Sequence, residues 1–196
     1  MEMQLYAIHV VPFVVFVYLA FLLFMQPPKE VIIATLTGGL VLGIINVLVD
    51  LIAYYASLWH YTASGQLLHL PLPLYLTPIV IYGGVGYLLI WRFWFGARSH
   101  LQRRSVAASA MRSDGVQGDT RTHWFAWLLL IGIPLFGFAR DLLDATVTHS
   151  SYITWTSPLA GPVDFVLWIV MFYGGFFVCR WLLPSTSGEQ KPQTNP

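Results

Sequence analysis

Five apolar stretches dominate the sequence, and each is long enough to cross a lipid bilayer as a helix. The hydrocarbon core of a bilayer is about 30 Å thick, which a helix of roughly 20 apolar residues spans. A closed β-barrel would need short alternating segments instead, and the sequence lacks them. We therefore expect an all-α integral membrane protein with five transmembrane helices, at Leu5–Met25, Val31–Leu58, Leu72–Phe95, Trp124–Val147 and Pro162–Leu183.

The composition excludes most other classes of protein. Of the 196 residues, 57% are hydrophobic and only 10% are charged, and the formal net charge is +1. A soluble domain has about a quarter charged residues, so this chain lacks the surface of a soluble or nucleic-acid-binding protein. Cys179 is the single cysteine, which excludes an internal disulfide and a multi-cysteine metal site. The histidines share no metal-ligand spacing, so we expect no metal and no cofactor.

The distribution of positive charge predicts the orientation of the chain. Cytoplasmic connections of membrane proteins are enriched in Lys and Arg. The connection 96–123 carries five arginines, whereas the connections 59–71 and 148–161 carry neither Lys nor Arg. We therefore expect the N-terminus outside and the C-terminus inside a plasma membrane. The first stretch follows Glu2 and no basic residue, so we expect a retained helix rather than a signal peptide.

A motif in the second stretch recurs in the fourth, 94 residues later. Gly43-x-x-Asn46-x-x-x-Asp50 matches Gly137-x-x-Arg140-x-x-x-Asp144, and Tyr-Gly-Gly occurs at both 82–84 and 173–175. The sequence thus predicts one extra helix plus two parallel-repeat helical hairpins. The expected parts are the first helix with the first hairpin (1–95), a basic cytoplasmic loop (96–123), the second hairpin (124–184) and a disordered cytoplasmic tail (185–196).

The repeat places the few charged side chains of the helices in one outer layer. At about 1.5 Å per residue, Asp50 and Arg140 lie near the outer ends of their helices, and Asp164 begins the fifth helix from the same side. Ionisable residues at such depth are functional candidates. The predicted catalytic residues are Asp164, Asp50, Asp144 and Arg140. The predicted substrate-binding residues are Asn46, Trp59, Tyr61, Trp155, Tyr82 and Tyr173.

Structural roles are equally compatible with these residues. Arg140 can form an ion pair with Asp144, four residues later, or with Asp50 across the repeat. Tryptophan and tyrosine gather at membrane interfaces whatever the function of the protein. An acid at a helix N-terminus, such as Asp164, complements the helix dipole without any chemistry.

With these residues in view, the repeat resembles the membrane-embedded carotenoid enzymes of the heterodimer or fused-domain lycopene cyclase type and their hydratase-like relatives. The half-unit of that family has an Asp late in one helix, then a Trp-x-aromatic pair, then a Pro-Leu-Glu-Glu-like opening of the next helix. Asp50, Trp59-His60-Tyr61 and Leu70–Leu74 follow this order, and Asp144, Trp155 and Pro162–Phe165 follow it more loosely. Where the family has paired Glu, this chain has Pro73 and Leu74 in one half and keeps only Asp164 in the other.

The resemblance implies acid-base chemistry on a lipophilic isoprenoid or carotenoid-like substrate, of the isomerase or lyase type. Asp164 would protonate a terminal double bond, Asp50 and Asp144 would act as base or orienting groups, and Arg140 would keep one carboxylate ionised. Aromatic rings would face the developing carbocation. The alternative is a non-catalytic transporter, lipid-binding protein, or assembly or sensor subunit. The expected partners are the membrane and a small lipid, without nucleic acid, and the choice between homo- and hetero-oligomer stays open.

Overall fold

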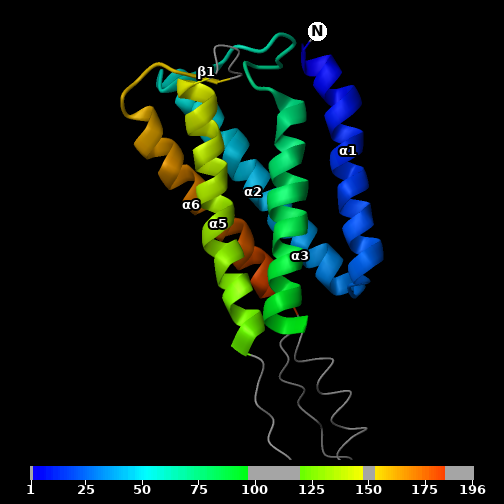
Figure 1. Ribbon diagram of the computed structural model, residues 1–196. Coiled ribbons are helices and arrows are strands. Elements are labelled where there is room, and N and C mark those ends of the chain that lie inside the picture. Colours follow the sequence, from blue (N-terminus) through cyan, green and yellow to red (C-terminus); the bar gives the residue numbers. More distant parts are fainter. Residues whose placement is uncertain (1, 97–119, 148–152, 184–196) are drawn as a thin grey trace, which may run out of the picture.

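The computed structural model describes residues 2–96, 120–147 and 153–183, and it is mostly helical (Figure 1). Within these ranges, five helices are long and apolar enough to cross a membrane, as the sequence predicts. The third helix combines a short 3-10 turn (Leu72–Tyr75), a π-helical segment (Pro78–Val85), α3 (Gly86–Trp91) and a last π-helical turn (Arg92–Gly96). The other four helices are α1 (Glu2–Met25), α2 (Lys29–Tyr55), α5 (Thr120–Thr146) and α6 (Ala160–Leu182).

Two short strands, which the sequence analysis did not predict, join the hairpins at one end of the bundle. Helix α2 ends at Tyr55, before the expected Leu58, and the chain then forms β1 (Trp59–Tyr61). This strand pairs antiparallel with β2 (Ile153–Trp155), and His60 lies opposite Thr154. We call this end, where the N-terminus also lies, the strand end (Figure 1). Because residues 60 and 154 are 94 apart, the strands pair in the register expected of a two-fold relation between the hairpins.

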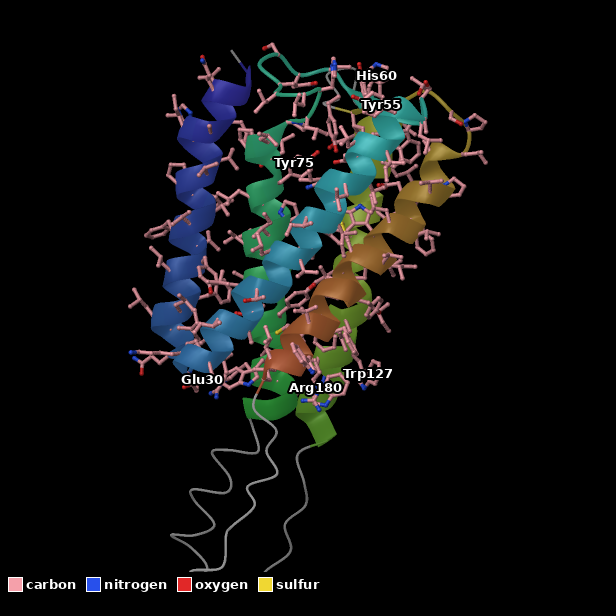
Figure 2. All side chains as sticks on the ribbon, turned by 180° about the vertical axis from the view of Figure 1, so that it is seen from behind. Glu30, Tyr55, His60, Tyr75, Trp127 and Arg180 are labelled. Atoms are coloured by element: carbon pink, nitrogen blue, oxygen red, sulfur yellow. The ribbon has the colours of Figure 1, made fainter. Side chains whose placement is uncertain are left out.

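Helix α1 packs on the third helix through a small apolar cluster. Val14 and Tyr18 of α1 contact Val80 and Val85 of the third helix. Near the strand end, the Tyr6 hydroxyl lies 2.7 Å from Thr77 Oγ1. Much of α1 remains uncovered, and large apolar side chains project from the outside of the whole bundle (Figure 2), as expected of surfaces that face lipid.

Helices α2 and α6 pack tightly along what we call the closed seam, around Gly38 and Gly175. A Cβ atom added at Gly38 would lie 2.6 Å from the Gly175 carbonyl oxygen, so only glycine permits this approach. Close by, the Tyr87 hydroxyl donates a 2.7 Å hydrogen bond to the Phe172 carbonyl oxygen. The closed seam therefore forms the centre of the core.

The third helix and α5 pack against each other mainly at the opposite end from the strands, along what we call the open seam. The rings of Phe93 and Phe125 lie 4.7 Å apart, and those of Trp94 and Trp127 lie 5.1 Å apart. Nearer the strand end, α5 and residues 72–85 leave a pocket between them. The two seams thus differ although their helices carry matching motifs. The predicted basic loop and tail lie almost entirely outside the described residues.

Candidate functional site

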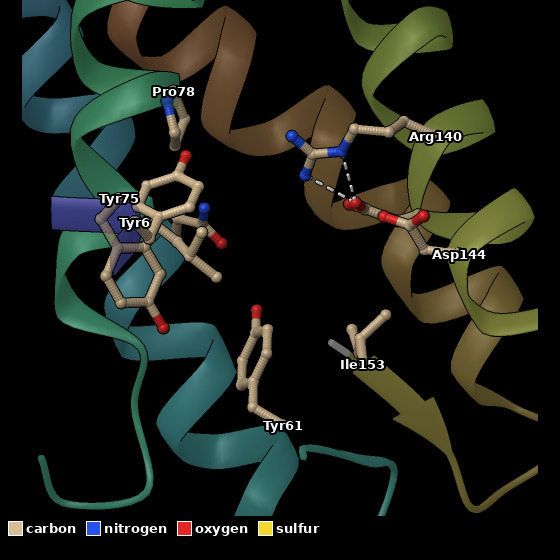
Figure 3. Close-up of a pocket in the computed structure, with 10 residues that line it drawn as sticks. Tyr6, Tyr61, Tyr75, Pro78, Arg140, Asp144 and Ile153 are labelled. Carbon is tan, nitrogen blue, oxygen red and sulfur yellow. Dashed lines mark hydrogen bonds and ion pairs between the residues drawn. The ribbon is translucent and has the colours of Figure 1, made fainter. Parts of the chain in front are cut away.

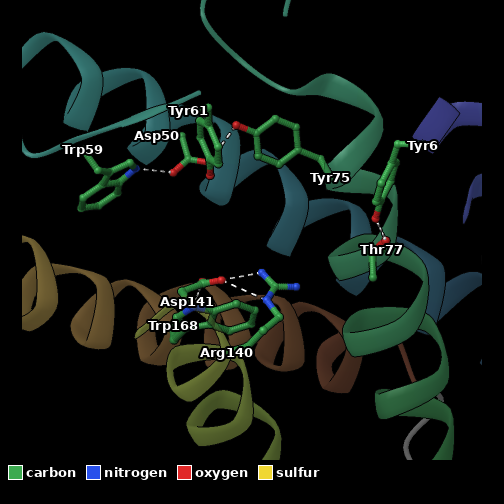
Figure 4. A network of polar contacts seen from close by, with 9 residues as sticks. All are labelled: Tyr6, Asp50, Trp59, Tyr61, Tyr75, Thr77, Arg140, Asp141 and Trp168. Carbon is green, nitrogen blue, oxygen red and sulfur yellow. Dashed lines mark hydrogen bonds and ion pairs between the residues drawn. The ribbon is translucent and has the colours of Figure 1, made fainter. Parts of the chain in front are cut away.

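Asp50 is enclosed by three hydrogen-bond donors that we call the aspartate cage (Figure 4). The Trp59 indole donates to Oδ1 at 3.0 Å, and the hydroxyls of Tyr61 and Tyr75 both donate to Oδ2 at 2.7 Å. Trp59 and Tyr61 reach the same carboxyl because alternate residues of β1 point to the same side. The Asp50 side chain is 3% exposed, and a carboxyl that only accepts hydrogen bonds is suited to its ionised form.

Arg140 forms an ion pair with its chain neighbour Asp141. Its Nε and Nη2 donate to Asp141 Oδ1 at 3.0 and 2.6 Å. The second oxygen, Oδ2, accepts a 2.8 Å hydrogen bond from the Trp168 indole of α6. The Arg140 guanidinium also lies 5.9 Å from the centre of the Trp168 ring. The ion pair therefore differs from both sequence alternatives, because Trp168 holds Asp141 within reach of the arginine.

The aspartate cage and the Arg140–Asp141 pair meet at a pocket of about 180 Å³ (Figure 3). Both hairpins contribute to its wall, and α1 adds one side chain. An engineered cavity of about 150 Å³ in another protein binds benzene, so this pocket has room for a single six-membered ring. The residues that line it are Tyr6, Asn46, Tyr61, Leu74, Tyr75, Pro78, Arg140, Asp141, Asp144 and Ile153.

Asp164 lies close to this pocket but is not part of its lining. Its side chain is 3% exposed, and its Oδ2 has no hydrogen-bond partner among the described residues. The charges of Asp141, Asp50 and Arg140 act on it electrostatically. Because a buried carboxylate oxygen without a partner is costly, this carboxyl is the one of the acidic layer that best accommodates a proton.

Tyr61 separates the pocket from a second hollow at the strand end. This outer hollow has a volume of about 570 Å³ and is lined by Tyr54, Tyr55, Ser57, Trp59, His60, Tyr61, Gln66, His69 and Thr156. Burial, together with the charge of Asp50, raises the pKa of Tyr61 well above its usual value. The Tyr61 hydroxyl therefore keeps its proton and remains a donor to Asp50 at physiological pH.

Several predicted substrate-binding residues lie outside the pocket lining. Trp59 faces the outer hollow, and Tyr82 packs edge-on against Trp168 with ring centres 5.3 Å apart. Tyr173 is 40% exposed and donates to the Leu130 carbonyl oxygen at 3.1 Å. Trp155 is partly buried, and its indole nitrogen has no partner among the described residues. Four of the predicted site residues line the pocket: Asn46, Tyr61, Arg140 and Asp144.

No role was predicted from the sequence for Tyr6, Tyr75, Asp141 or Trp168. The signal for Trp168 was its position four residues after Asp164, on the same helix face. Tyr75 opens the third helix at the strand end, where a polar side chain could be expected. Tyr6 carried no signal, because nothing in the sequence places α1 beside the pocket.

Among the residues that the structure describes, no three His, Cys, Asp or Glu side chains gather as metal ligands would. No family model, curated protein or solved structure matches this chain.

Proposed function

We propose that the protein is a multi-pass membrane protein that acts on the end of a lipophilic isoprenoid or carotenoid-like substrate by acid-base chemistry, in the manner of a cyclase. The observation that carries this proposal is the pocket, in which the scarce charged side chains of an apolar bundle meet around a ring-sized space. In the proposed arrangement, two related hairpins and α1 cross a plasma membrane with the N-terminus outside and the C-terminus inside.

The hydrogen bonds support different roles for the acids. Asp50 accepts at both oxygens, which suits an ionised group that orients Tyr61 and Tyr75. Both oxygens of Asp141 likewise accept hydrogen bonds, from Arg140 and from Trp168. Asp164, whose Oδ2 has no hydrogen-bond partner among the described residues, is the proposed acid, and Asp144 in the pocket wall is the proposed base.

The proposed reaction is an isomerisation. Protonation of a terminal double bond gives a carbocation, attack by a second double bond closes a ring, and loss of a proton to Asp144 gives the neutral product. The rings of Tyr61 and Tyr75 in the wall would favour the cation. Asp164 lies behind the residues that line the pocket. Its proton therefore has to move past these residues before it reaches a substrate in the pocket.

The residues of the family resemblance support the proposal because they bind one another. Asp50, Trp59 and Tyr61, which carry the resemblance in the first half, form one hydrogen-bonded group. Trp59 and Tyr61 follow Asp50 by nine and eleven residues, and this spacing brings the three side chains into one structural motif.

The alternative is a non-catalytic role as a transporter, lipid-binding protein, or assembly or sensor subunit. One observation favours transport: the π-helical segment Pro78–Val85 begins at Pro78, which lines the pocket. Interrupted helices are common beside the binding sites of transporters, and π-helical turns are common at functional sites.

The test is to express the protein in cells that are supplied with linear or cyclic carotenoids, and to compare their pigments by chromatography. We expect a new cyclic product with the wild type and its loss with Asp164→Asn. Glu30→Gln is the matched control, because Glu30 is an exposed acid at the opposite end of the bundle (Figure 2). Unchanged pigments with both wild type and Asp164→Asn would remove the enzymatic proposal. Folding of each variant is checked by thermal unfolding in detergent.

A further inference from the structure

The pocket holds a charged donor that a pure hydrocarbon cannot satisfy. The Arg140 side chain is 43% exposed, and its guanidinium points into the pocket (Figure 3). A guanidinium carries five N–H donors; the hydrogen bonds to Asp141 use its Nε and Nη2, and the Tyr82 side chain is a further hydrogen-bond partner. Filling this pocket with an apolar group would remove water from the donors that remain and replace none of their hydrogen bonds.

The other residues that line the pocket favour a ligand oxygen atom that carries no charge. Asn46 adds an amide, and Asp141 and Asp144 add two carboxyls against the single Arg140 cation. An anionic end group, such as a carboxylate or a phosphate, would therefore meet net repulsion. A hydroxyl or carbonyl oxygen instead accepts from Arg140 or Asn46 and creates no like-charge contact.

The size and position of the pocket limit the rest of the ligand. About 180 Å³ holds one six-membered ring, so a longer molecule has to leave the pocket. Helix α5 and residues 72–85 both contribute to the wall, and the third helix and α5 pack together mainly toward the end opposite the strands. The open seam is therefore the place where the tail of a longer ligand would leave the pocket.

We propose that the pocket binds a lipid whose ring-sized end group carries a neutral oxygen, held by Arg140 and Asn46, while its hydrocarbon tail extends through the open seam. This inference rests on the proposed function for the isoprenoid class, and it narrows that class to oxygenated end groups. Hydroxylated or carbonyl-bearing isoprenoids are thus preferred over the corresponding hydrocarbons.

The test compares two carotenoids with the same carbon skeleton, β-carotene and zeaxanthin, which differ by one hydroxyl on each terminal ring. The full-length protein in lipid nanodiscs is titrated with each, and quenching of tryptophan fluorescence is measured. We expect zeaxanthin to bind at least tenfold more tightly than β-carotene. Equal binding, or tighter binding of β-carotene, would overturn the inference without any variant being made.

Two variants locate the preference. Arg140→Gln should bring zeaxanthin binding to within threefold of β-carotene binding, and Arg180→Gln, which removes an exposed arginine at the opposite end, should leave the preference unchanged (Figure 2). A preference that survives Arg140→Gln would overturn the role of the arginine. A second probe pair tests charge: retinol should bind more tightly than retinoic acid, and the reverse order contradicts the neutral oxygen.

These outcomes separate the two proposals. If the protein cyclises a hydrocarbon carotenoid but shows no preference for zeaxanthin, the enzymatic proposal stands and the oxygenated end group is wrong. If zeaxanthin binds through Arg140 but no carotenoid changes in cells, the binding site stands and the chemistry is wrong.

Discussion

The closed and open seams are built from matching positions, yet they pack differently. By the offsets of the repeat, Gly38 of α2 corresponds to Gly132 of α5, and Gly175 of α6 corresponds to Gly84 of the third helix. Gly38 and Gly175 touch in the closed seam. Gly84 instead faces Tyr18 of α1, and a Cβ atom at Gly132 would meet only a side chain of its own helix, at 4.0 Å.

This difference shows where the pocket comes from. Both seams have the small residues that allow close packing, but Tyr18 of α1 covers Gly84 of the third helix. Helix α5 then meets the third helix mainly toward the end opposite the strands, and the space left near the strand end is the pocket. A hollow can thus arise where an added helix covers a residue that would otherwise allow two helices to pack closely.

The largest expected effect separates the two matched glycines. We expect Gly38→Ala to destabilise the protein by about 3 kcal/mol, because its Cβ would meet the backbone carbonyl of Gly175, which cannot move without opening the seam. Gly132→Ala should be neutral or stabilise by up to about 1 kcal/mol, since alanine favours a helix where there is space. Thermal unfolding of both variants in the same detergent measures this, and equal destabilisation would contradict the comparison of the seams.

The five helices could be predicted from the sequence because they follow from the length of the apolar stretches. The alternation of their directions along the chain follows from their order and from the repeated motifs. The expected bounds of α2 and α6 differ from the observed ones by two or three residues at Tyr55 and Ala160. The strands could not be predicted, since three-residue strands such as Trp59–Tyr61 form through a partner that lies 94 residues away.

The candidate site was predicted in part. Asn46, Asp50 and Arg140 share a helical spacing with their counterparts, which placed them in one layer. The partner of Arg140 could not be predicted, because residues one apart on a helix do not ordinarily face each other. The hydrogen bond from Trp168, which lies on another helix, orients the Asp141 carboxyl. Tyr173 was chosen by its likeness to Tyr82, but it lies on the outside of α6.

A smaller effect should separate the matched acids Asp50 and Asp144. Asp50→Asn places an amide donor among three donors, so a tyrosine hydroxyl either turns to accept from the amide or loses its hydrogen bond, at a cost of about 2 kcal/mol. Asp144→Asn should cost less than about 1 kcal/mol, because Asp144 is only half-buried in the pocket wall. The same thermal unfolding assay measures both variants. A larger loss of stability for Asp144→Asn than for Asp50→Asn would show that the aspartate cage does not stabilise the fold more than Asp144 does.

The smallest effect concerns Tyr61, whose counterpart by the repeat is Trp155, a residue that does not titrate. Because the pKa of Tyr61 is raised in the folded state, the folded protein keeps this proton above about pH 10, where an unfolded tyrosine loses it. This contribution to stability is complete below pH 10 and falls as pH rises above it. Between pH 9 and pH 11, Tyr61→Phe should reduce the total loss of stability by about 1 kcal/mol.

The control for this measurement is Tyr55→Phe, because Tyr55 is 75% exposed. Its dependence of stability on pH should match that of the wild type. If Tyr61→Phe behaves in the same way, the Tyr61 proton is not held by the fold.

The pairing of β1 with β2 has a consequence for how such a chain can originate. His60 pairs with Thr154, the residue 94 positions later in the chain, so exchanging the two strands leaves the pairing register unchanged. Two separate polypeptides, each with one hairpin, could pair their strands in this same register. A half-length ancestor that assembled with its own copy is therefore geometrically sufficient, and gene fusion would have freed each half to diverge.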